Sequence, residues 1–244
     1  MDLREAMKAR HMVRKYLDKS MPEDIVQKLN TRVKENNEKY GVAVELRIND
    51  TSAFNSLIKL ILAKGIQNFF VLQGNDTPEL DENLGKCGAD IMLYAQTLGL
   101  NTWWVGGTFN RGKLNEKSNG KKVIGVIGVG YGATQGVPHK SKTYEDVASY
   151  TGETPAWFID GVNAALLAPT ALNKQEFTIK GVGSKVVITA NKESIFSGAD
   201  IGLVKYHFEL GAGKENFSFY AIVVNFGKVK KSCPKHLTQV SGYN

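Results

Sequence analysis

Apolar residues along the chain recur with the period of helices in some segments and with the period of strands in others. Residues 80–98 keep a helical spacing and end at Gly99, a residue type that commonly terminates helices. Residues 123–130 are apolar and rich in β-branched side chains, as expected for a strand that is covered on both faces. The same pattern predicts further helices at 3–16, 20–37, 154–167 and 200–210, and further strands at 42–48, 67–72, 177–179, 185–189 and 217–226.

Two of these helices contain the same four-residue sequence. Residues 88–91 read Gly-Ala-Asp-Ile and precede a helix end at Leu98-Gly99, and residues 198–201 repeat those letters before Leu210-Gly211. The order of helix, glycine and strand around both copies is similar, which indicates a diverged internal duplication. We therefore predict two intertwined halves, residues 1–150 and 151–244, that form one compact unit around one site.

The composition predicts a globular protein of the reducing cytoplasm. The 244 residues are 42% hydrophobic and 23% charged, enough to bury a sizeable core. The chain has no run of about 18 apolar residues and starts with a charged, helical stretch, so we predict neither a membrane span nor secretion. Cys87 and Cys233 lie far apart and without a second ligand at metal-binding spacing, which argues against a zinc site or a disulfide framework.

The charge balance favours a phosphorylated ligand over a nucleic acid. The net charge of +7 comes from 31 Lys and Arg spread among 24 Asp and Glu, and the densest run is Lys228, Lys230 and Lys231. No patch interleaved with aromatic residues accompanies these basic side chains. We expect a solvated basic surface that attracts phosphates.

Three segments carry residues suited to binding a flat, phosphorylated ligand. In the first, Arg10 and Arg14 are four residues apart, so on a helix they share one face and present forked donors to a phosphate. A surface helix often carries such a pair without any ligand.

The second segment, residues 167–177, joins a helix to a strand. Pro169 stops the helix, and the amides of Asn173 and Gln175 can both donate and accept hydrogen bonds at the edge of a ring. An ordinary connecting loop is the alternative interpretation. The third segment, residues 98–107, has Gly106 and Gly107, which let the backbone approach a ring closely.

These segments resemble the signature motifs of the FMN-dependent nitroreductase superfamily. Residues 10–14 are similar to its Arg-Xaa-Ser-Xaa-Arg motif, with Met12 in place of Ser. Residues 168–177 resemble its Ala-Pro-Ser-Xaa-Xaa-Asn-Xaa-Gln-Pro-Trp stretch, with Thr170 for Ser and Glu176-Phe177 for Pro-Trp. Residues 98–107 look like its Leu-Gly-Leu-Gly-Thr-Xaa-Trp-Xaa-Gly-Gly segment, and residues 140–142 fall where the family often has a basic residue that binds phosphate.

The resemblance implies an α+β fold in which a central, mostly antiparallel sheet is flanked by helices. It implies FMN as the cofactor, reduced by NAD(P)H, which then leaves so that a nitroaromatic, quinone or similar acceptor can be reduced in the same cleft by ping-pong kinetics. No side chain is expected to act as a nucleophile or general base. The cofactor-binding residues that the resemblance suggests are Arg10, His11, Met12, Arg14, Trp104, Val105, Gly106, Gly107, Lys140, Lys142, Pro169, Thr170, Asn173 and Gln175.

The order of the motifs resembles a branch of the superfamily in which two halves are fused. Ordinary members build each FMN site at a homodimer interface, and each motif occurs once in this chain. The resemblance therefore implies one FMN per chain, in a monomer that acts as a pseudo-dimer or in a homodimer.

Two other interpretations remain open at this point. Residues 128–133 follow an apolar strand and fit the Gly-Xaa-Gly-Xaa-Xaa-Gly/Ala pattern of a Rossmann-type NAD site, in which Gly128, Gly130 and Gly132 would meet the pyrophosphate, although Gly136 and Pro138 interrupt the helix that this site needs. A flavin-binding module without turnover is the second, favoured by Met12 and Glu176-Phe177. We expect the remaining histidines, His139, His207 and His236, at surface or helix-face positions.

Overall fold

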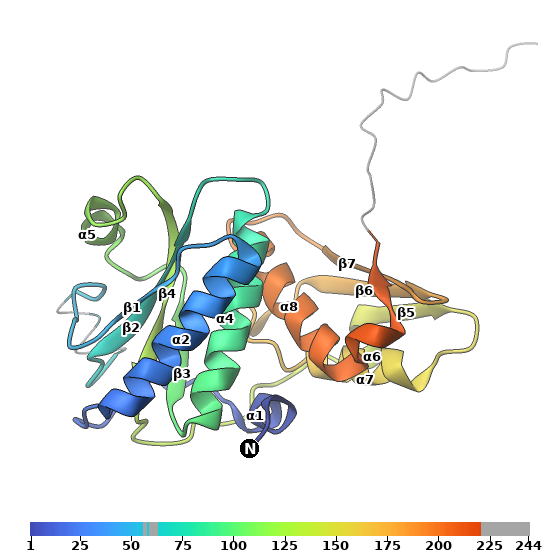
Figure 1. Cartoon of the computed structure of the whole chain (residues 1–244). Coiled ribbons are helices and arrows are strands. Elements are labelled where there is room, and N and C mark those ends of the chain that lie inside the picture. The colour runs from blue at the N-terminus through green and yellow to red at the C-terminus, as the bar shows by residue number, and fades with distance from the viewer. Residues whose placement is uncertain (56–57, 59–62, 221–244) are drawn as a thin grey trace, which may run out of the picture.

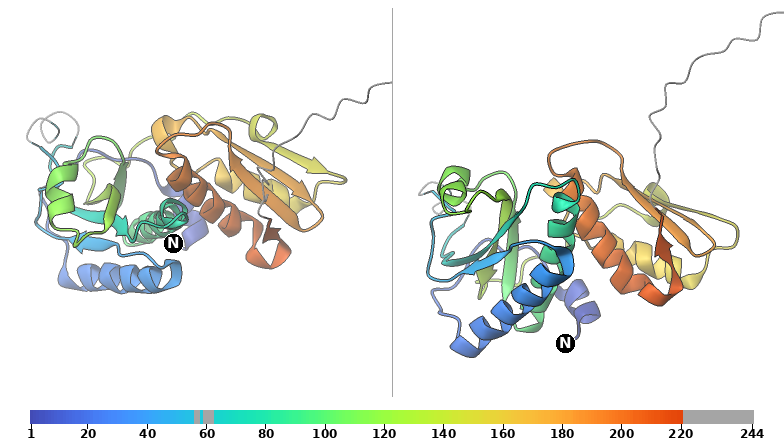
Figure 2. Two further views of the ribbon diagram at one scale, coloured as in Figure 1. Left: turned by 90° about the horizontal axis from the view of Figure 1, so that it is seen from above. Right: turned by 45° about the horizontal axis from the view of Figure 1, so that its top comes forward.

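The computed structural model describes residues 1–55, 58 and 63–220, and it has two four-stranded sheets with long helices between them (Figure 1). Helix α4 (Leu80–Thr97) packs against the first sheet, and α8 (Ser197–Ala212) lies beside α4 and contacts the second sheet (Figure 2). Helix α2 (Glu23–Tyr40) covers α4 on the outside. Helices α4 and α8 were both predicted, and the core that they share explains why their sequences are so apolar.

The first sheet has the order β1-β2-β4-β3, and all of its neighbours are antiparallel. Its strands are β1 (Glu45–Arg47), β2 (Asn68–Gly74), β4 (Lys122–Gly130) and β3 (Asn101–Val105). Apolar clusters cover both faces: one contains Phe70 and Ile127, and the other contains Phe69 and Trp103. This two-sided burial accounts for the apolar run that predicted β4. A short helix, α5 (Arg111–Glu116), connects β3 to β4.

The second sheet has the order β5-β6-β7-β8. Its strands are β5 (Ala148–Thr151), β6 (Phe177–Val182), β7 (Lys185–Ala190) and β8 (Ser218–Phe219). The central pair is antiparallel and the two outer pairs are parallel. Helix α7 (Ala156–Ala165) packs on α8 through the rings of Phe158 and Phe208, whose centroids are 5.8 Å apart. The predicted α+β class with mostly antiparallel strands and flanking helices is confirmed, although the strands form two sheets instead of one central sheet.

The prediction of a helix over residues 3–16 is wrong beyond its first half. Helix α1 (Leu3–Ala9) starts at a capping box between Asp2 and Glu5 and ends at Ala9. The chain then runs extended, and Met12 and Tyr16 form isolated bridges with Thr102 and Gly132. Pairing with the edge of a distant strand overrides the helical preference of this segment.

Some elements were not predicted, and one prediction extends past the described residues. The structure adds β3, β5, α5 and α6 (Tyr144–Val147) to the expected elements. The strand predicted at 217–226 is seen at Ser218–Phe219, and residues 221–226 lie outside the described residues, as do Lys228, Lys230, Lys231, Cys233 and His236. In the described part of the chain, none of the helices has the length and apolar character needed to span a bilayer.

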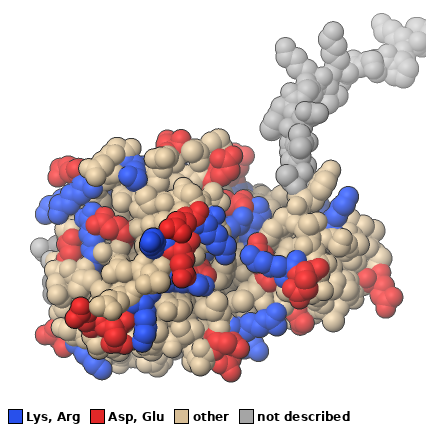
Figure 3. Space-filling view, viewed as in Figure 1, with Lys and Arg blue, Asp and Glu red and all other residues tan. Residues whose placement is uncertain are grey.

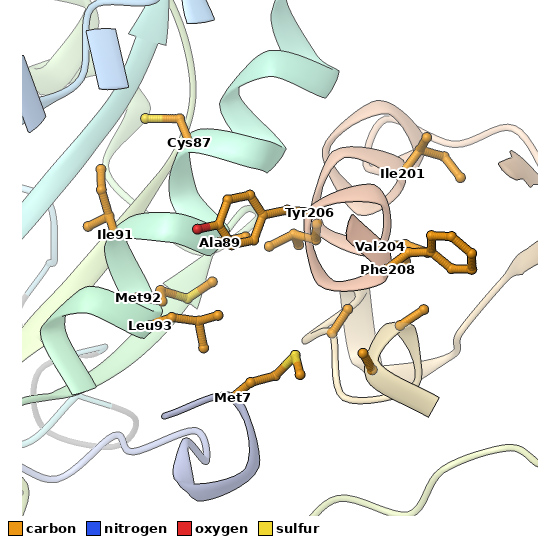
Figure 4. Packing of buried hydrophobic residues seen from close by; sticks show 14 of the residues in the cluster. Met7, Cys87, Ala89, Ile91, Met92, Leu93, Ile201, Val204, Tyr206 and Phe208 are labelled. Carbon is orange, nitrogen blue, oxygen red and sulfur yellow. The ribbon is translucent and has the colours of Figure 1, made fainter. Parts of the chain in front are cut away.

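Helices α4 and α8 approach each other so closely that only glycine fits at their crossing. A Cβ atom added to Gly202 would lie 2.8 Å from the Cα of Gly85 and would overlap the carbonyl oxygen of Glu82. The apolar side chains in Figure 4 fill the space around this contact, with Tyr206 of α8 reaching toward α4. The two sheets are therefore joined through a backbone-to-backbone helix contact.

A buried carboxylate strengthens the same contact. Asp90 of α4 accepts hydrogen bonds from Arg32 Nε at 2.6 Å and Nη2 at 2.7 Å, from Asn36 Nδ2 at 2.7 Å and from the Tyr206 hydroxyl at 2.5 Å. Because a buried charge is tolerated only when it is fully hydrogen-bonded, this network ties α2, α4 and α8 together.

The division into residues 1–150 and 151–244 stays a prediction. Strand β5 spans the proposed boundary and pairs with β6 of the second sheet. In the first sheet β2 and β3 lie on opposite sides of β4, whereas in the second β7 and β8 are direct neighbours. The repeated Gly-Ala-Asp-Ile sequence is therefore accompanied by different strand orders.

On the face shown in Figure 3, basic and acidic side chains are interspersed. A typical pair joins Lys28 to Asp24 across one turn of α2, with 3.0 Å between Nζ and Oδ2. Exposed pairs of this kind contribute little to stability, because water screens the two charges. The core, rather than these ion pairs, holds the fold together.

The close crossing of α4 and α8 should make the protein sensitive to a larger residue at Gly202. Replacing Gly202 with Ala forces α4 and α8 apart and should lower the free energy of unfolding by about 2 to 3 kcal/mol. The matched control is Gly112→Ala in α5, where the added Cβ would meet only Asn110 Oδ1 at 3.9 Å. That variant should be neutral or more stable by up to about 1 kcal/mol. Urea unfolding curves measure both, and equal midpoints for the two variants would show that the crossing is not tight.

Candidate functional site

Arg10 is a buried cation without a counter-charge. Its backbone N–H caps α1 by donating to the carbonyl of Ala6 at 2.8 Å, and its side chain is only 6% exposed. Its guanidinium makes no hydrogen bond or ion pair with any residue that the structure describes. Burial lowers the pKa of Arg10 to about 10. Since an unpaired buried charge is unfavourable, Arg10 is a candidate for binding an anion.

Arg10 opens onto a small cleft, which we call the Arg10 cleft. It is formed by the end of α1, the loop after β4 and the end of α7 and has a volume of about 40 Å³. Its lining residues are Met7, Lys8, Arg10, His11, Pro138, His139, Ser141 and Leu167. None of them is acidic, and the volume suits a few water molecules or one phosphate group but not a tricyclic ring.

Three imidazoles surround Arg10. The His139 ring lies in the cleft with Nε2 3.0 Å from the carbonyl oxygen of Leu166, and burial together with the charges of Arg10 and His139 lowers the pKa of His11. Burial, assisted by Arg10 and His139, lowers the pKa of His207 to about 3. The permanent positive charge of the cleft therefore comes from Arg10 and Lys8.

His207 lies on a helix, as expected, but its side chain is buried and not at the surface. His207 of α8 is 1% exposed, with Nδ1 2.8 Å from the carbonyl oxygen of Leu203, and its Nε2 has no partner among the described residues. His139 is half-buried in the cleft. Sequence spacing gave no signal for either, because their neighbours come from other elements.

The loop of residues 169–175 is held to the loop after β4. The backbone N–H of Lys142 donates to Gln175 Oε1 at 2.7 Å, and its Nζ donates to the Gln175 carbonyl at 2.9 Å. Gln175 Nε2 in turn donates to Leu166 O at 2.8 Å. Both polar ends of the Gln175 side chain are thus used internally, so this residue shapes the loop, and Lys142 keeps only part of its donor capacity for a ligand.

Asn173 keeps a free acceptor in this loop. Its Nδ2 donates to the carbonyl of Lys140 at 2.6 Å, whereas its Oδ1 is buried without a partner in the described chain. Thr170 accepts from the backbone N–H of Gln175 at 3.1 Å. Leu172, Asn173 and Gln175 have φ angles of 52°, 54° and 49°, a left-handed conformation that non-glycine residues adopt at a cost. Half-buried Pro169 precedes these residues.

The other predicted residues lie elsewhere. Arg14 is exposed, with its guanidinium carbon 5.3 Å from the centroid of the Trp103 ring, and Met12 is 47% exposed. Trp104 packs on Gly88 of α4, and Val105 pairs with Val126 inside the sheet. These residues do not line the Arg10 cleft.

Gly106 and Gly107 follow β3 and approach the start of α8. A Cβ added to Gly106 would lie 3.0 Å from the ring of Phe196, which caps that helix. The structure thus brings together residues 10–11, 138–142 and 167–175, and it leaves Arg14 and residues 104–107 outside their cleft.

The Rossmann interpretation is wrong. Gly128 and Gly130 lie within β4, which pairs antiparallel with β2 and β3. No helix begins in the glycine pattern, because the next helix starts at Tyr144. A pyrophosphate would therefore meet no helix N-terminus.

Among the described residues, no group of three or more His, Cys, Asp or Glu side chains is placed to hold a metal ion. Burial raises the pKa of the Cys87 thiol, which keeps this cysteine protonated inside the core. The cationic nitrogens of Lys8 and Arg10 at the cleft suit an anion such as an organic phosphate.

Comparison with known proteins identifies the family. The family model described as "Putative TM nitroreductase" matches residues 2–212. A putative nitroreductase from Thermotoga maritima has a similar structure, with a TM-score of 0.65 and 19% identity over 88% of this chain and 85% of that chain. A search of the curated proteins gave no match.

Two shorter proteins share the fold over part of the chain. A nitroreductase-like protein from Streptococcus mutans has a TM-score of 0.50 and 14% identity over 59% of this chain and 96% of that chain. A putative NAD(P)H:FMN oxidoreductase from Staphylococcus epidermidis has a TM-score of 0.50 and 12% identity over 60% of this chain and 94% of that chain. Because the family model spans most of the described residues, the chain belongs to the nitroreductase family that this model describes.

Proposed function

We propose that this protein is an FMN-dependent NAD(P)H oxidoreductase that reduces a small nitroaromatic, quinone or similar acceptor. The observation that carries the proposal is Arg10, a buried guanidinium without a counter-charge among the described residues, at the start of the motif that resembles the family's phosphate-binding segment. Family membership supports the general chemistry, and the cleft supports a phosphorylated cofactor.

The phosphate end of FMN fits the Arg10 cleft. A phosphate carries about −1.5 to −2 charge at neutral pH and accepts several charge-assisted hydrogen bonds. Lys8, Arg10 and His11 line a space of about the right size, while the Ser141 hydroxyl donates to the carbonyl of Leu166 at 3.2 Å. Lys140 is exposed beside this cleft and adds a mobile positive charge.

The isoalloxazine end has to lie outside the cleft, which is too small for it. The two loops that form the cleft expose apolar side chains, with Val137 78% and Leu172 85% exposed. Asn173 Oδ1 offers an unused acceptor in the same loop. Large exposed apolar side chains beside an unsatisfied polar atom are what a flat, amphipathic ring requires.

Bound FMN supplies the redox chemistry by taking up and releasing two electrons. The chain has to bind the phosphate, orient the ring and leave one ring face open to both NAD(P)H and the acceptor. Sharing one open face leads to ping-pong kinetics. None of these tasks needs a nucleophile or a general base from the protein.

A flavin-binding module without turnover is the alternative. Met12 stands where the family motif has Ser, and its exposed thioether offers no hydroxyl for a ribityl or phosphate contact. This observation weakens the binding expected at residues 10–14 without removing Arg10.

Purified protein tests the proposal directly. We expect a flavin absorption spectrum, release of FMN on denaturation as identified by mass, and bleaching by NADH or NADPH under anaerobic conditions. A yellow protein that neither nucleotide bleaches would favour the module without turnover. A colourless protein that does not bind added FMN would rule out both.

Replacing Arg10 with an uncharged residue should stabilise the protein and weaken its binding of FMN. In Arg10→Met the buried charge is removed, so the ligand-free protein should unfold at a higher urea concentration, while the FMN dissociation constant should rise about 10- to 100-fold, as for a lost charged hydrogen bond of about 1.5 to 3 kcal/mol. Flavin fluorescence measures the second effect.

The matched control is Arg4→Met, because Arg4 lies exposed on the same helix. It should leave the FMN dissociation constant within about twofold, and the free energy of unfolding within about 0.5 kcal/mol, of the values for the unchanged protein. If Arg10→Met binds FMN as tightly as Arg4→Met, the phosphate does not occupy the Arg10 cleft.

The chain should bind one FMN. Although the Gly-Ala-Asp-Ile sequence is repeated, the described residues contain only one buried arginine without an ion pair, which is Arg10. They therefore offer one phosphate site of this kind. Titration of the flavin-free protein should therefore saturate at one FMN per chain. Saturation at two would reveal a site that this cleft does not explain.

A further inference from the structure

The two copies of the Gly-Ala-Asp-Ile sequence place their aspartates in opposite situations. Asp90 is saturated by Arg32, Asn36 and Tyr206. Asp200 has one donor, the backbone N–H of Ala171, at 3.0 Å from Oδ1 and 3.1 Å from Oδ2. One carboxylate is a finished structural element, and the other is half-buried with a single partner among the described residues.

That partner belongs to the loop of residues 169–175. The far end of the loop is fixed by Gln175 and Asn173, which bind the segment of Lys140 and Lys142. The near end is tied to the helical core through Asp200 on the first turn of α8. Because the residues between these anchors have left-handed φ angles, the loop needs both anchors to keep its conformation.

No charge compensates Asp200. Burial raises the pKa of Asp200 to about 6, and the Ala171 amide is the only other contribution. The charged side chains of the packed elements, Lys174 of the loop, Asp81 and Glu82 of α4 and Lys205 of α8, make no contribution. Ionisation of Asp200 therefore leaves a half-buried negative charge that accepts one hydrogen bond from the described residues.

We propose that Asp200 is the positioning residue of this loop: by accepting the Ala171 amide through its carboxyl oxygens it fixes residues 169–175 in the conformation that receives the flavin. The inference rests on the proposed function, since the loop is the one that resembles the family's flavin-facing motif. Asp200 itself touches the loop and not the cofactor.

The sign of the pH effect follows from linkage. A group whose pKa is higher in the closed loop than in the open, solvated loop binds more protons when the loop is closed. Closure is therefore favoured at low pH and weakened as the pH rises through about 6. An asparagine keeps the acceptor oxygen without the charge, so it should hold the loop at every pH.

The test compares Asp200→Asn, Asp200→Ala and the control Asp160→Asn, an exposed aspartate on α7. Hydrogen exchange of the loop is measured in the full, ligand-free chain, and FMN binding is measured by fluorescence, both at pH 5 and pH 8. Comparing variants at one pH cancels the titration of the FMN phosphate, whose second pKa is also near 6.

We expect Asp200→Asn to protect the loop and to bind FMN more tightly than the unchanged protein at both pH values, with an advantage at pH 8 that exceeds the advantage at pH 5 by up to about tenfold. Asp200→Ala should expose the loop and weaken FMN binding about tenfold at pH 5, and Asp160→Asn should change nothing. If Asp200→Asn keeps the loop protection and FMN binding that Asp200→Ala loses, the acceptor oxygen positions the loop. A general loss of packing would not be restored in this way.

Two outcomes overturn the inference and differ from each other. If the unchanged protein binds FMN and all three variants bind it alike at both pH values, Asp200 does not position the loop for the flavin. If the unchanged protein binds no FMN, the proposed function fails and the inference fails with it, while loop exchange still reports whether Asp200 anchors Ala171.

Discussion

The close crossing of α4 and α8 is the constraint on which the rest of the structure depends. Gly85 and Gly202 bring two helix backbones into contact, and each helix carries one sheet with it. The crossing also sets where the two ends of the candidate site stand, because α1 packs on α4 and the loop of residues 169–175 is tied to α8. A small change in helix separation would move Arg10 relative to that loop.

The charged side chains inside the protein differ in how completely they are paired, and this difference separates a structural site from the candidate functional site. Asp90 is surrounded by donors and ties three helices together, as a buried carboxylate of a stable core must. Arg10 is buried and Asp200 is half-buried, neither pairs with an opposite charge in the described part of the chain, and both belong to the elements around the Arg10 cleft. Proteins keep such unfavourable groups where a ligand or a conformational change makes use of them.

The sequence predicted elements whose signal is local and missed those that depend on distant partners. The periodicity of residues 80–98 and 123–130 was enough for α4 and β4, since burial on their own faces shapes both. Residues 101–105 became β3 because they pair with β4, and no local pattern shows that pairing. The histidines at the cleft were missed for the same reason.

The motif at residues 10–14 shows how one helix end changes the meaning of a sequence pattern. On a continuous helix, Arg10 and Arg14 would share a face and one phosphate. Helix α1 ends at Ala9, so Arg10 turns into the cleft while Arg14 rests over Trp103. Residue types therefore suggest a phosphate-like anion as the ligand, which stays a prediction, and only the backbone path decides which arginine can meet it.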